Sequence, residues 1–210
     1  AAQTAFGHLD YNVPIGGAVM SCPHKATALN DGAVLIVDNL TEEEIQSVES
    51  LPQGLEFNRI KHQGRVLLKS GDPQKELEGL TLLKELEESW PSDFPQRMTD
   101  ISKKLLARLD PLAHAQRRIK NCRRLRQRLN KYLPSVFNAL GTPFGHPVLI
   151  NNRDELLSKL HDKRVFATRL WHNVIVDEKL TPVALDYSRR LLALPVDQRY
   201  NEEDMDFFLY

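Results

Sequence analysis

The stretch Leu192-Ala193-Leu194-Pro195-Val196-Asp197-Gln198-Arg199-Tyr200-Asn201-Glu202-Glu203-Asp204-Met205 sets an apolar run directly before a segment rich in acids. The apolar run is typical of a closing strand. Asn201 is a favoured N-cap residue, and the acids after it suit the positive end of a helix dipole. The stretch therefore predicts a strand followed by a helix at the end of a small α/β domain.

The segment from residue 134 to 210 is predicted to form the whole of this small domain. Residues 148–150 are apolar and feed a helix over about 153–160, residues 165–171 form a second strand, and residues 182–192 form a helix. Strands that alternate with helices in this order are typical of an α/β layer. We expect its core to contain Val148, Leu149, Ile150, Phe166, Leu170, Leu191, Leu192 and Leu194.

Upstream, a continuous apolar run over residues 33–37 has the length and the β-branched composition of an inner strand buried on both faces. Thr41 and Glu44 then have the spacing of a capping box, which predicts a short helix. Further helices are predicted near residues 55–69, 74–89, 99–109 and 112–132. In the helix near 99–109, a stripe of Ile101, Leu105, Leu106 and Leu109 is expected to be buried.

The bulk composition limits the classes of function. The chain has 210 residues, enough for one large domain or somewhat more, and its 28 basic and 28 acidic residues cancel. The net charge thus gives no indication of a nucleic acid or a membrane as partner. Two distant cysteines, Cys22 and Cys122, indicate neither a disulfide framework nor a zinc site and favour the cytoplasm. The first residues lack an initiator Met and the basic region of a signal peptide, which suggests a processed or truncated start.

A lysine stands just before a predicted turn. Lys25 follows Ser21-Cys22-Pro23-His24 and lies six residues before Asp31-Gly32, which leads into the apolar strand. A lysine that must attack a carbonyl carbon as a neutral amine benefits from partial burial and a fixed position. Spacing alone leaves two interpretations open, a nucleophilic lysine and an ordinary surface lysine.

Three segments together resemble the C-terminal half of the DegT-type sugar aminotransferases, which use pyridoxal 5′-phosphate (PLP). They are Asn151-Asn152-Arg153-Asp154-Glu155-Leu156, Arg169-Leu170-Trp171-His172 and the closing stretch quoted above. The resemblance implies an α/β fold, namely the C-terminal part of a fold-type I aminotransferase. Residues 1–110 would then be the end of the large PLP-binding domain, residues 111–133 a connecting helix, and residues 134–210 the small domain.

The resemblance also implies roles for individual residues. Lys25 would be the catalytic lysine that holds PLP, with Ser21 and His24 as further cofactor-binding residues. The chain departs from the family pattern at His24, where Arg is usual, at Asn30, where Pro is usual, and at the turn, which has one Gly where two are common. No metal is expected.

Two residues of the small domain are candidates for substrate binding. Arg169 has the planar fork that suits a phosphate or carboxylate, although it would serve equally to pair with an acid of the small domain. His172 could contact a sugar hydroxyl or a phosphate, or it could cap a sheet edge.

The helix expected over 112–132 carries eight Lys and Arg residues, which could track phosphates of a nucleic acid. Its apolar positions, Ile119, Cys122, Leu125 and Leu129, form one stripe, and such a helix is more often a solvated one. Neither a nucleic acid nor a membrane is therefore expected as partner. In the resembling enzymes this is the helix that joins the two domains.

The resemblance leaves two functions open. The first is transamination of a nucleotide-linked keto-sugar with an amino-acid donor, in a homodimer that shares its active sites. The second is a non-catalytic binding or assembly module, or half of a split enzyme, on the same scaffold. In the family, the residues that stack on the PLP ring and bind its phosphate precede the lysine. Only 24 residues precede Lys25, so we expect weak PLP binding unless a further segment or a partner chain supplies them.

Overall fold

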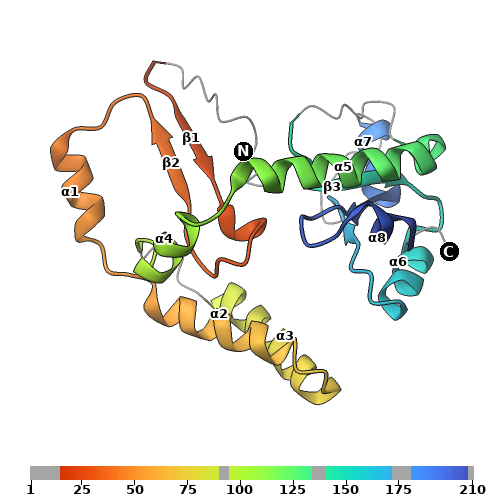
Figure 1. Ribbon diagram of the computed structural model, residues 1–210, viewed down its shortest axis with the longest axis horizontal. Helices are drawn as coiled ribbons and strands as arrows, with labels where there is room; N and C mark the ends of the chain where they lie inside the picture. Colours follow the sequence, from red (N-terminus) through yellow and green to blue (C-terminus); the bar gives the residue numbers. More distant parts are fainter. Residues whose placement is uncertain (1–14, 90–94, 134–140, 172–180, 208–210) are drawn as a thin grey trace. The chain divides into compact units, whose positions relative to one another are not determined.

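The computed structural model describes residues 15–89, 95–133, 141–171 and 181–207 (Figure 1). The chain divides into two compact units, one extending to Leu109 and the other beginning at Asp110. We describe each unit by itself.

The first unit contains a hairpin and a set of helices. Its elements are β1 (Ala18–Ser21), the 3-10 turn η1 (Pro23–Lys25), β2 (Val34–Val37), α1 (Glu42–Ser50), α2 (Leu55–Leu67), α3 (Pro73–Ser89) and α4 (Asp100–Leu106). The helices α2 and α3 lie side by side (Figure 1). They approach closely at Gly64 and Gly79, where an added methyl group would meet the neighbouring helix within 3 Å.

The hairpin corrects one expectation. β2 was predicted to be an inner strand buried on both faces, but it pairs antiparallel with β1 in a sheet that has two strands among the described residues. Met20 lies opposite Leu35, and these side chains are 52% and 60% exposed. The apolar run is strand-forming as predicted, but no described element covers this face of it.

The capping box that starts α1 is confirmed. Thr41 Oγ1 accepts a hydrogen bond from the Glu44 backbone N–H at 3.2 Å, and Glu44 Oε2 accepts one from the Thr41 backbone N–H at 2.9 Å. These two bonds satisfy donors that a helix start otherwise leaves to water. The local pattern therefore defines this helix even though it buries none of its residues.

The prediction of which face of α4 is buried is wrong. Ile101 and Leu105 are 63% and 44% exposed, whereas Thr99 and Ser102 are almost wholly buried. The helix turns its polar first residues inward because a buried carboxylate, described below, binds them. Periodicity locates the helix, but a specific polar partner decides which face it buries.

The second unit is built around a three-stranded antiparallel sheet. Its elements are α5 (Pro111–Leu129), η2 (Asn130–Tyr132), β3 (Gly145–Leu149), α6 (Arg153–Asp162), β4 (Thr168–Arg169), α7 (Pro182–Arg190), β5 (Leu191–Pro195) and α8 (Glu202–Asp206). The strand order is β3-β5-β4. The closing strand and helix are confirmed, but α7 ends at Arg190, two residues earlier than expected, because Leu191 and Leu192 already pair in the sheet.

The core of this unit confirms the prediction for half of the eight residues expected in it, namely Val148, Leu191, Leu192 and Leu194. It consists of Cys122, Leu125, Val148, Leu157, Leu160, Val165, Ala167, Leu192, Leu194, Val196 and Met205. Leu191 is also buried, whereas Leu149, Ile150 and Leu170 are half-buried. Phe166, expected in the core, is 69% exposed. The strand expected over 165–171 is confined to β4, and before it the Ala167 N–H donates to the Val165 carbonyl at 3.1 Å across Phe166. Val165 and Ala167 are buried on either side of the exposed phenylalanine.

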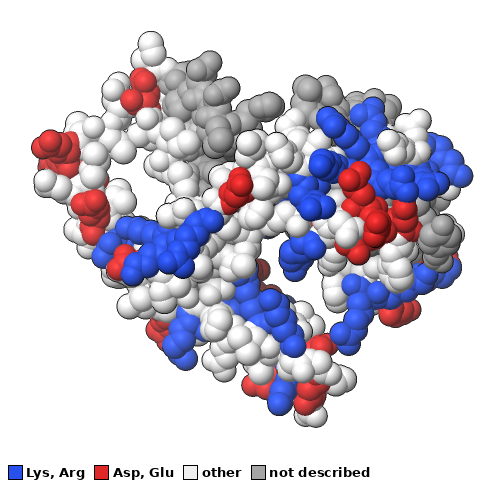
Figure 2. Space-filling view, in the orientation of Figure 1, with Lys and Arg blue, Asp and Glu red and all other residues white. Residues whose placement is uncertain are grey.

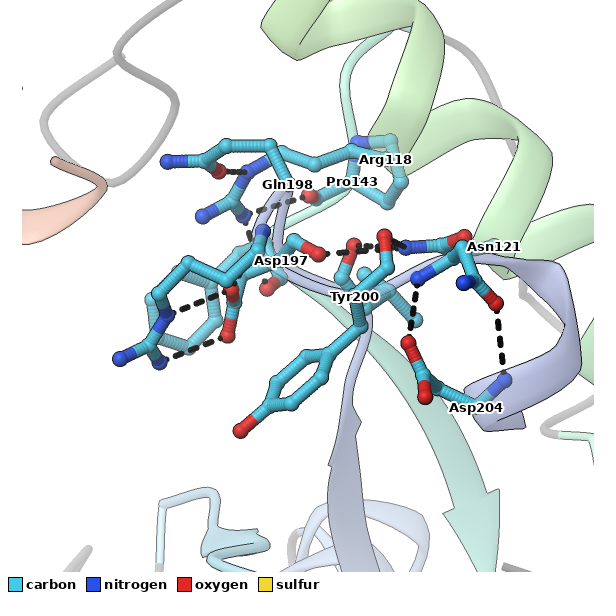
Figure 3. A network of polar contacts seen from close by, with 11 residues as sticks. Arg118, Asn121, Pro143, Asp197, Gln198, Tyr200 and Asp204 are labelled. Carbon is cyan, nitrogen blue, oxygen red and sulfur yellow. Dashed lines mark hydrogen bonds and ion pairs between the residues drawn. The ribbon is translucent and has the colours of Figure 1, made fainter. Parts of the chain in front are cut away.

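Two polar side chains of α5 hold the loop that follows β5 (Figure 3). Arg118 donates to Gln198 Oε1 at 2.8 Å and to the Pro143 carbonyl at 3.1 Å. Asn121 Nδ2 donates to three backbone carbonyls at 3.0–3.3 Å, those of Val196, Asp197 and Tyr200. Buried carbonyls need donors, so these bonds fix the path of the chain between the last strand and the last helix.

Candidate functional site

Lys25 ends a short 3-10 turn that follows β1 directly. The Lys25 backbone N–H donates to the Cys22 carbonyl at 3.1 Å, and Thr27 Oγ1 donates to the Pro23 carbonyl at 2.8 Å. The residues on either side of Lys25 are partly or wholly buried, whereas Lys25 itself is exposed. The fold thus fixes the backbone of the lysine but leaves its side chain accessible rather than partly buried as the chemistry would favour.

Of the other predicted cofactor-binding residues, Ser21 ends β1 just before this turn and His24 lies within it. The Ser21 hydroxyl is buried and has no hydrogen-bond partner among the described residues. His24 Nδ1 lies 2.8 Å from the Gly32 carbonyl, which can only accept, so this nitrogen carries the proton. Burial lowers the pKa of His24, and the nearby cations Lys61, Lys25 and Arg65 lower it further against the opposing effect of the Gly32 bond.

Asp31 is the centre of a buried polar network that joins the turn to two helices. Its carboxylate accepts hydrogen bonds from the Thr99 backbone N–H at 2.8 Å, from Asn58 Nδ2 at 2.6 Å and from the Ser102 hydroxyl. Thr99 Oγ1 lies a further 3.1 Å from the carboxylate. A buried carboxylate is stable only when its oxygens are satisfied in this way. Asp31 therefore ties the lysine turn to α2 and to the start of α4.

Three residues on one face of α2 approach the same turn. Asn58 binds Asp31, and Arg65 Nη1 donates to the carbonyls of Ala28 and Leu29 at 2.9 and 2.8 Å. Lys61 lies between Asn58 and Arg65 along the helix and is half-buried. Burial lowers the pKa of Lys61, and the nearby Arg65 lowers it further.

The single glycine of the turn is required by its surroundings. Gly32 has a φ of +104°, and a Cβ atom placed there would lie 2.2 Å from Met98 Cε. Side chains are strongly disfavoured in this backbone region, and the methionine fills the space beside it. The turn therefore brings the backbone of residue 32 against the chain just before α4.

Arg169 is engaged within the second unit. Its Nε lies 3.1 Å from Asp154 Oδ1, an oxygen that Arg153 also binds at 3.0 Å. Of the two interpretations of Arg169, the structure shows the pairing with an acid, although its side chain remains 43% exposed. His172, the other predicted substrate residue, lies outside the described residues.

A cysteine and a histidine meet in the core of the second unit. Cys122 Sγ lies 3.4 Å from His146 Nδ1, and both residues are buried. Burial raises the pKa of the Cys122 thiol to about 11 and lowers the pKa of His146 to about 4. Both groups are neutral near pH 7, whereas a nucleophilic pair needs a thiolate. This contact is part of the packing.

The basic side chains of α5 are engaged by polar partners of their own unit at several points. Arg124 forms a two-point contact with Asp206 on α8, and Arg118 is buried against carbonyl groups. In Figure 2, basic side chains of the second unit lie interspersed with acidic ones. The arrangement is that of a solvated helix with ion pairs, not of an uninterrupted basic track.

The described part of the chain shows neither a metal site nor a membrane-spanning helix. Within residues 15–89, 95–133, 141–171 and 181–207, no group of three His, Cys, Asp or Glu residues is arranged to hold a metal ion. None of the helices described is both long enough and apolar enough to cross a membrane.

The sequence alone did not reveal several residues of the turn network. The sequence did not assign a set of helix residues to the site, because they lie far along the chain from Lys25: Asn58, Lys61, Arg65, Thr99 and Ser102. One signal was present. Thr99 and Ser102 are three residues apart, which places two hydroxyl groups on one face of the first helical turn.

A comparison with solved structures finds proteins of similar fold. The chain matches, over its full length, 54% of a DegT/DnrJ/EryC1/StrS aminotransferase from Brucella abortus, with a TM-score of 0.55 and 16% identity. The fold is that of part of an aminotransferase. A PLP-dependent aminotransferase from Bacillus cereus ATCC 10987 matches 95% of the chain over 52% of its own length, with 14% identity and a TM-score of 0.48.

The likeness confirms, at the level of the fold, the resemblance to DegT-type aminotransferases. The chain spans about half the length of the aminotransferases it matches. No protein-family model matches the sequence, and no curated protein matches it. The similarity to these aminotransferases is therefore one of fold, with a low sequence identity.

Proposed function

We propose that this chain is the C-terminal portion of a PLP-dependent aminotransferase, with Lys25 as the lysine that carries the cofactor. The observation that supports the proposal most strongly is the match of the whole chain to the aminotransferase fold. The exposed Lys25 side chain stands on a 3-10 turn whose backbone is held by hydrogen bonds to the Cys22 and Pro23 carbonyls. His24 of the same turn lies 2.8 Å from the Gly32 carbonyl.

The residues around the turn fit the cofactor. The buried Ser21 hydroxyl lacks a hydrogen-bond partner among the described residues, and an oxygen of a bound group would satisfy it. Lys25 offers an accessible amine four residues later. PLP, when bound, supplies an aldehyde carbon that an amine can attack and a ring that accepts electron density.

In this proposal each residue of the turn has a definite task. Lys25 Nζ would hold the cofactor, and as a free amine it would move the proton at the reacting carbon. Asp31 positions the turn through its bonds to Asn58 and Thr99. Ser21 and His24 are the proposed polar contacts of the cofactor.

For the substrate we propose a nucleotide-linked keto-sugar, with an amino acid as the donor of the amino group. Arg169 and His172 are the proposed contacts of that substrate. Arg169 can reach a phosphate only by sharing or leaving its present partner Asp154, and its 43% exposed side chain leaves room for that exchange.

The proposal includes a need for further polypeptide. The chain matches 54% of the Brucella abortus aminotransferase, and apolar side chains on the β1–β2 hairpin are exposed. We propose that a second copy or another chain segment completes the cofactor site, so the 210 residues alone bind PLP weakly. Tight stoichiometric binding by a monomer in a spectroscopic titration would contradict this part of the proposal.

The proposed function can be tested by adding PLP to the protein, measuring the absorbance of the complex, and reducing the complex with borohydride. The purified protein, incubated with excess PLP, is expected to turn yellow and, after borohydride reduction, to carry the added mass on Lys25. Lys25→Ala should lose both signals, whereas Lys69→Ala, at an exposed position after α2, should keep them. Persistence of both signals in the Lys25→Ala protein would rule out this lysine, and their absence from the wild type would favour a non-catalytic module.

A further inference from the structure

The segment from His24 to Gly32, which we call the lysine loop, is closed at its two ends. His24 Nδ1 lies 2.8 Å from the Gly32 carbonyl, so the first and last residues of the loop are in contact. Within the loop, Ala26 and Leu29 are buried, whereas Lys25 is exposed. The closure makes the backbone position of Lys25 depend on the shape of the rest of the loop.

A threonine links the turn that carries Lys25 to the middle of this loop. Thr27 Oγ1 donates to the Pro23 carbonyl at 2.8 Å and accepts a hydrogen bond from the Leu29 backbone N–H at 3.3 Å. A hydroxyl group can do both at once, and such local bonds fix the backbone on either side. A displacement of Leu29 would therefore be passed on to the 3-10 turn.

The middle of the lysine loop is bound by one side chain of α2. Arg65 Nη1 lies 2.9 Å from the Ala28 carbonyl oxygen, 2.8 Å from the Leu29 carbonyl oxygen and 2.9 Å from Asn30 Oδ1. These distances are those of charge-assisted hydrogen bonds. Acceptors from three successive residues thus converge on one nitrogen atom, which fixes the path of the backbone over residues 28–30.

The helix gives this guanidinium a rigid support. Gly64, the residue before Arg65, packs so closely on α3 that an added Cβ would lie 2.7 Å from Leu83 Cγ. Asn58, two helical turns earlier on the same face, donates to Asp31 at 2.6 Å. Packing on one side of α2 and hydrogen bonds on the other therefore hold Arg65 in place beside the loop.

We propose that Arg65 is a positioning residue for Lys25. It holds residues 28–30 in the conformation that, through Thr27, keeps the 3-10 turn and its lysine in one place, and it touches neither cofactor nor substrate itself. A lysine with a fixed approach attacks a carbonyl carbon faster than one on a loop that moves. The effect on the attack rests on the proposed function, but the hold of Arg65 on the loop does not.

The first experiment measures the order of the loop by amide hydrogen exchange in the full chain. Exchange in peptides from residues 24–32 is expected to become about tenfold faster in Arg65→Met, as the loss of one charge-assisted contact would give. Arg65→Lys should lie between that variant and the wild type, because an ammonium can bind a carbonyl but lacks the planar fork. Arg59→Met, whose side chain on α2 is 68% exposed, is the matched control and should leave the exchange unchanged.

A variant within the loop tests the contact without altering the helix. Asn30→Ala removes one of the three acceptors of Arg65 and should speed exchange severalfold. In the Arg65→Met background the same substitution should have little further effect, because its partner is already absent. Independent effects of the two substitutions, or an unchanged exchange rate in Arg65→Met, would overturn the hold of Arg65 on the loop.

The second experiment measures the positioning of the amine. With excess PLP, the Lys25 amine attacks the aldehyde carbon, water leaves, and borohydride then delivers a hydride to give a stable secondary amine. Acetic anhydride, which needs no bound orientation, measures the intrinsic reactivity of the same amine. We expect the ratio of the PLP rate to the acetylation rate at Lys25 to fall about tenfold in Arg65→Met, to recover in part in Arg65→Lys and to be unchanged in Arg59→Met.

The two proposals can fail separately. Faster exchange of the loop in Arg65→Met with an unchanged rate ratio at Lys25 would overturn the positioning role, because the order of the loop would then not matter to the amine. Labelling of wild-type Lys25 by PLP no faster than that of the exposed Lys69 would contradict the proposed function and with it the effect on the attack. The hold of Arg65 on the loop would still be decided by the exchange rates.

Discussion

Asp31 shows how one buried residue can organise a turn. The sequence places it before Gly32 as an ordinary turn residue, but its carboxylate binds groups from Asn58, Thr99 and Ser102. Hydrogen bonds to a charged group contribute about 1.5–3 kcal/mol each, and their loss leaves buried donors unsatisfied. The rigidity of the lysine turn therefore depends on residues that lie far from it in the chain.

Asp31→Asn should lower the free energy of unfolding by roughly 2–4 kcal/mol, because the amide presents donors to donors and cannot accept all the bonds. Denaturant unfolding measures the change. Glu78→Gln, at an exposed position on α3, is the matched control and should change stability by less than about 0.5 kcal/mol. Equal effects of the two substitutions would show that the network contributes little.

His146 makes the stability of the fold depend on pH. Its pKa in the folded protein is about 4 because of burial, below the ordinary value of 6.5. Between these values the unfolded chain binds more protons, so stability is complete above pH 6.5 and falls as the pH drops toward 4. The loss from this group is roughly 3 kcal/mol.

The measurement compares wild-type protein with His146→Gln over this range. We expect the variant to be less stable at pH 7 but to lose about 3 kcal/mol less than the wild type between pH 7 and pH 4. Parallel pH profiles for the two proteins would mean that His146 is not the group responsible.

At the scale of elements, the segment after the lysine turn packs against the segment before α4, where the Gly32 backbone closely approaches the Met98 side chain. Gly32 combines a φ of +104° with contact to Met98. Gly71, between α2 and α3, has a φ of +74° but nothing within 4 Å of an added Cβ. A substitution at Gly71 therefore tests backbone strain alone, whereas a substitution at Gly32 tests backbone strain together with steric crowding.

Gly71→Ala should cost about 1–2 kcal/mol of unfolding free energy, the penalty of a left-handed residue. Gly32→Ala should cost about 1–3 kcal/mol more, because the methyl group also displaces Met98. Thermal or denaturant unfolding gives both values, and Met98→Ala should recover part of the additional loss in the Gly32→Ala protein. Similar costs at the two glycines would show that Met98 moves aside freely.

At the scale of the whole molecule, one face of the hairpin in the first unit is left uncovered by the residues that the structure describes. Met20 and Leu35 lie opposite each other and are more than half exposed. An isolated two-stranded sheet is marginally stable, and a contiguous apolar face favours association. The chain should therefore self-associate through this face when no other polypeptide covers it.

The double variant Met20→Thr, Leu35→Thr places β-branched residues, which favour strands, at both positions and should shift the protein toward the monomer in sedimentation or light scattering. The matched pair Val183→Thr and Leu112→Thr, exposed apolar positions in the second unit, should leave the mass distribution as it is. An unchanged oligomer in the hairpin variant would place the association elsewhere.

The sequence by itself determined the order and type of most elements, because their signals are local. Apolar runs, the capping box at Thr41, and the N-cap Asn201 with its acids are all recognised within a few residues of the chain. The position of Lys25 before a glycine turn is also local, and so is the final strand and helix pair.

Only the tertiary structure decided which faces are buried and which distant residues share a site. α4 turns Thr99 inward and leaves Ile101 in water because the partner of Thr99 is Asp31, 68 residues earlier. Phe166 is exposed, whereas its neighbours Val165 and Ala167 are buried. Asn58 and Arg65 of α2 bind segment 28–31, which follows the lysine turn. Periodicity cannot predict this contact, because hydrogen bonds act across space rather than along the chain.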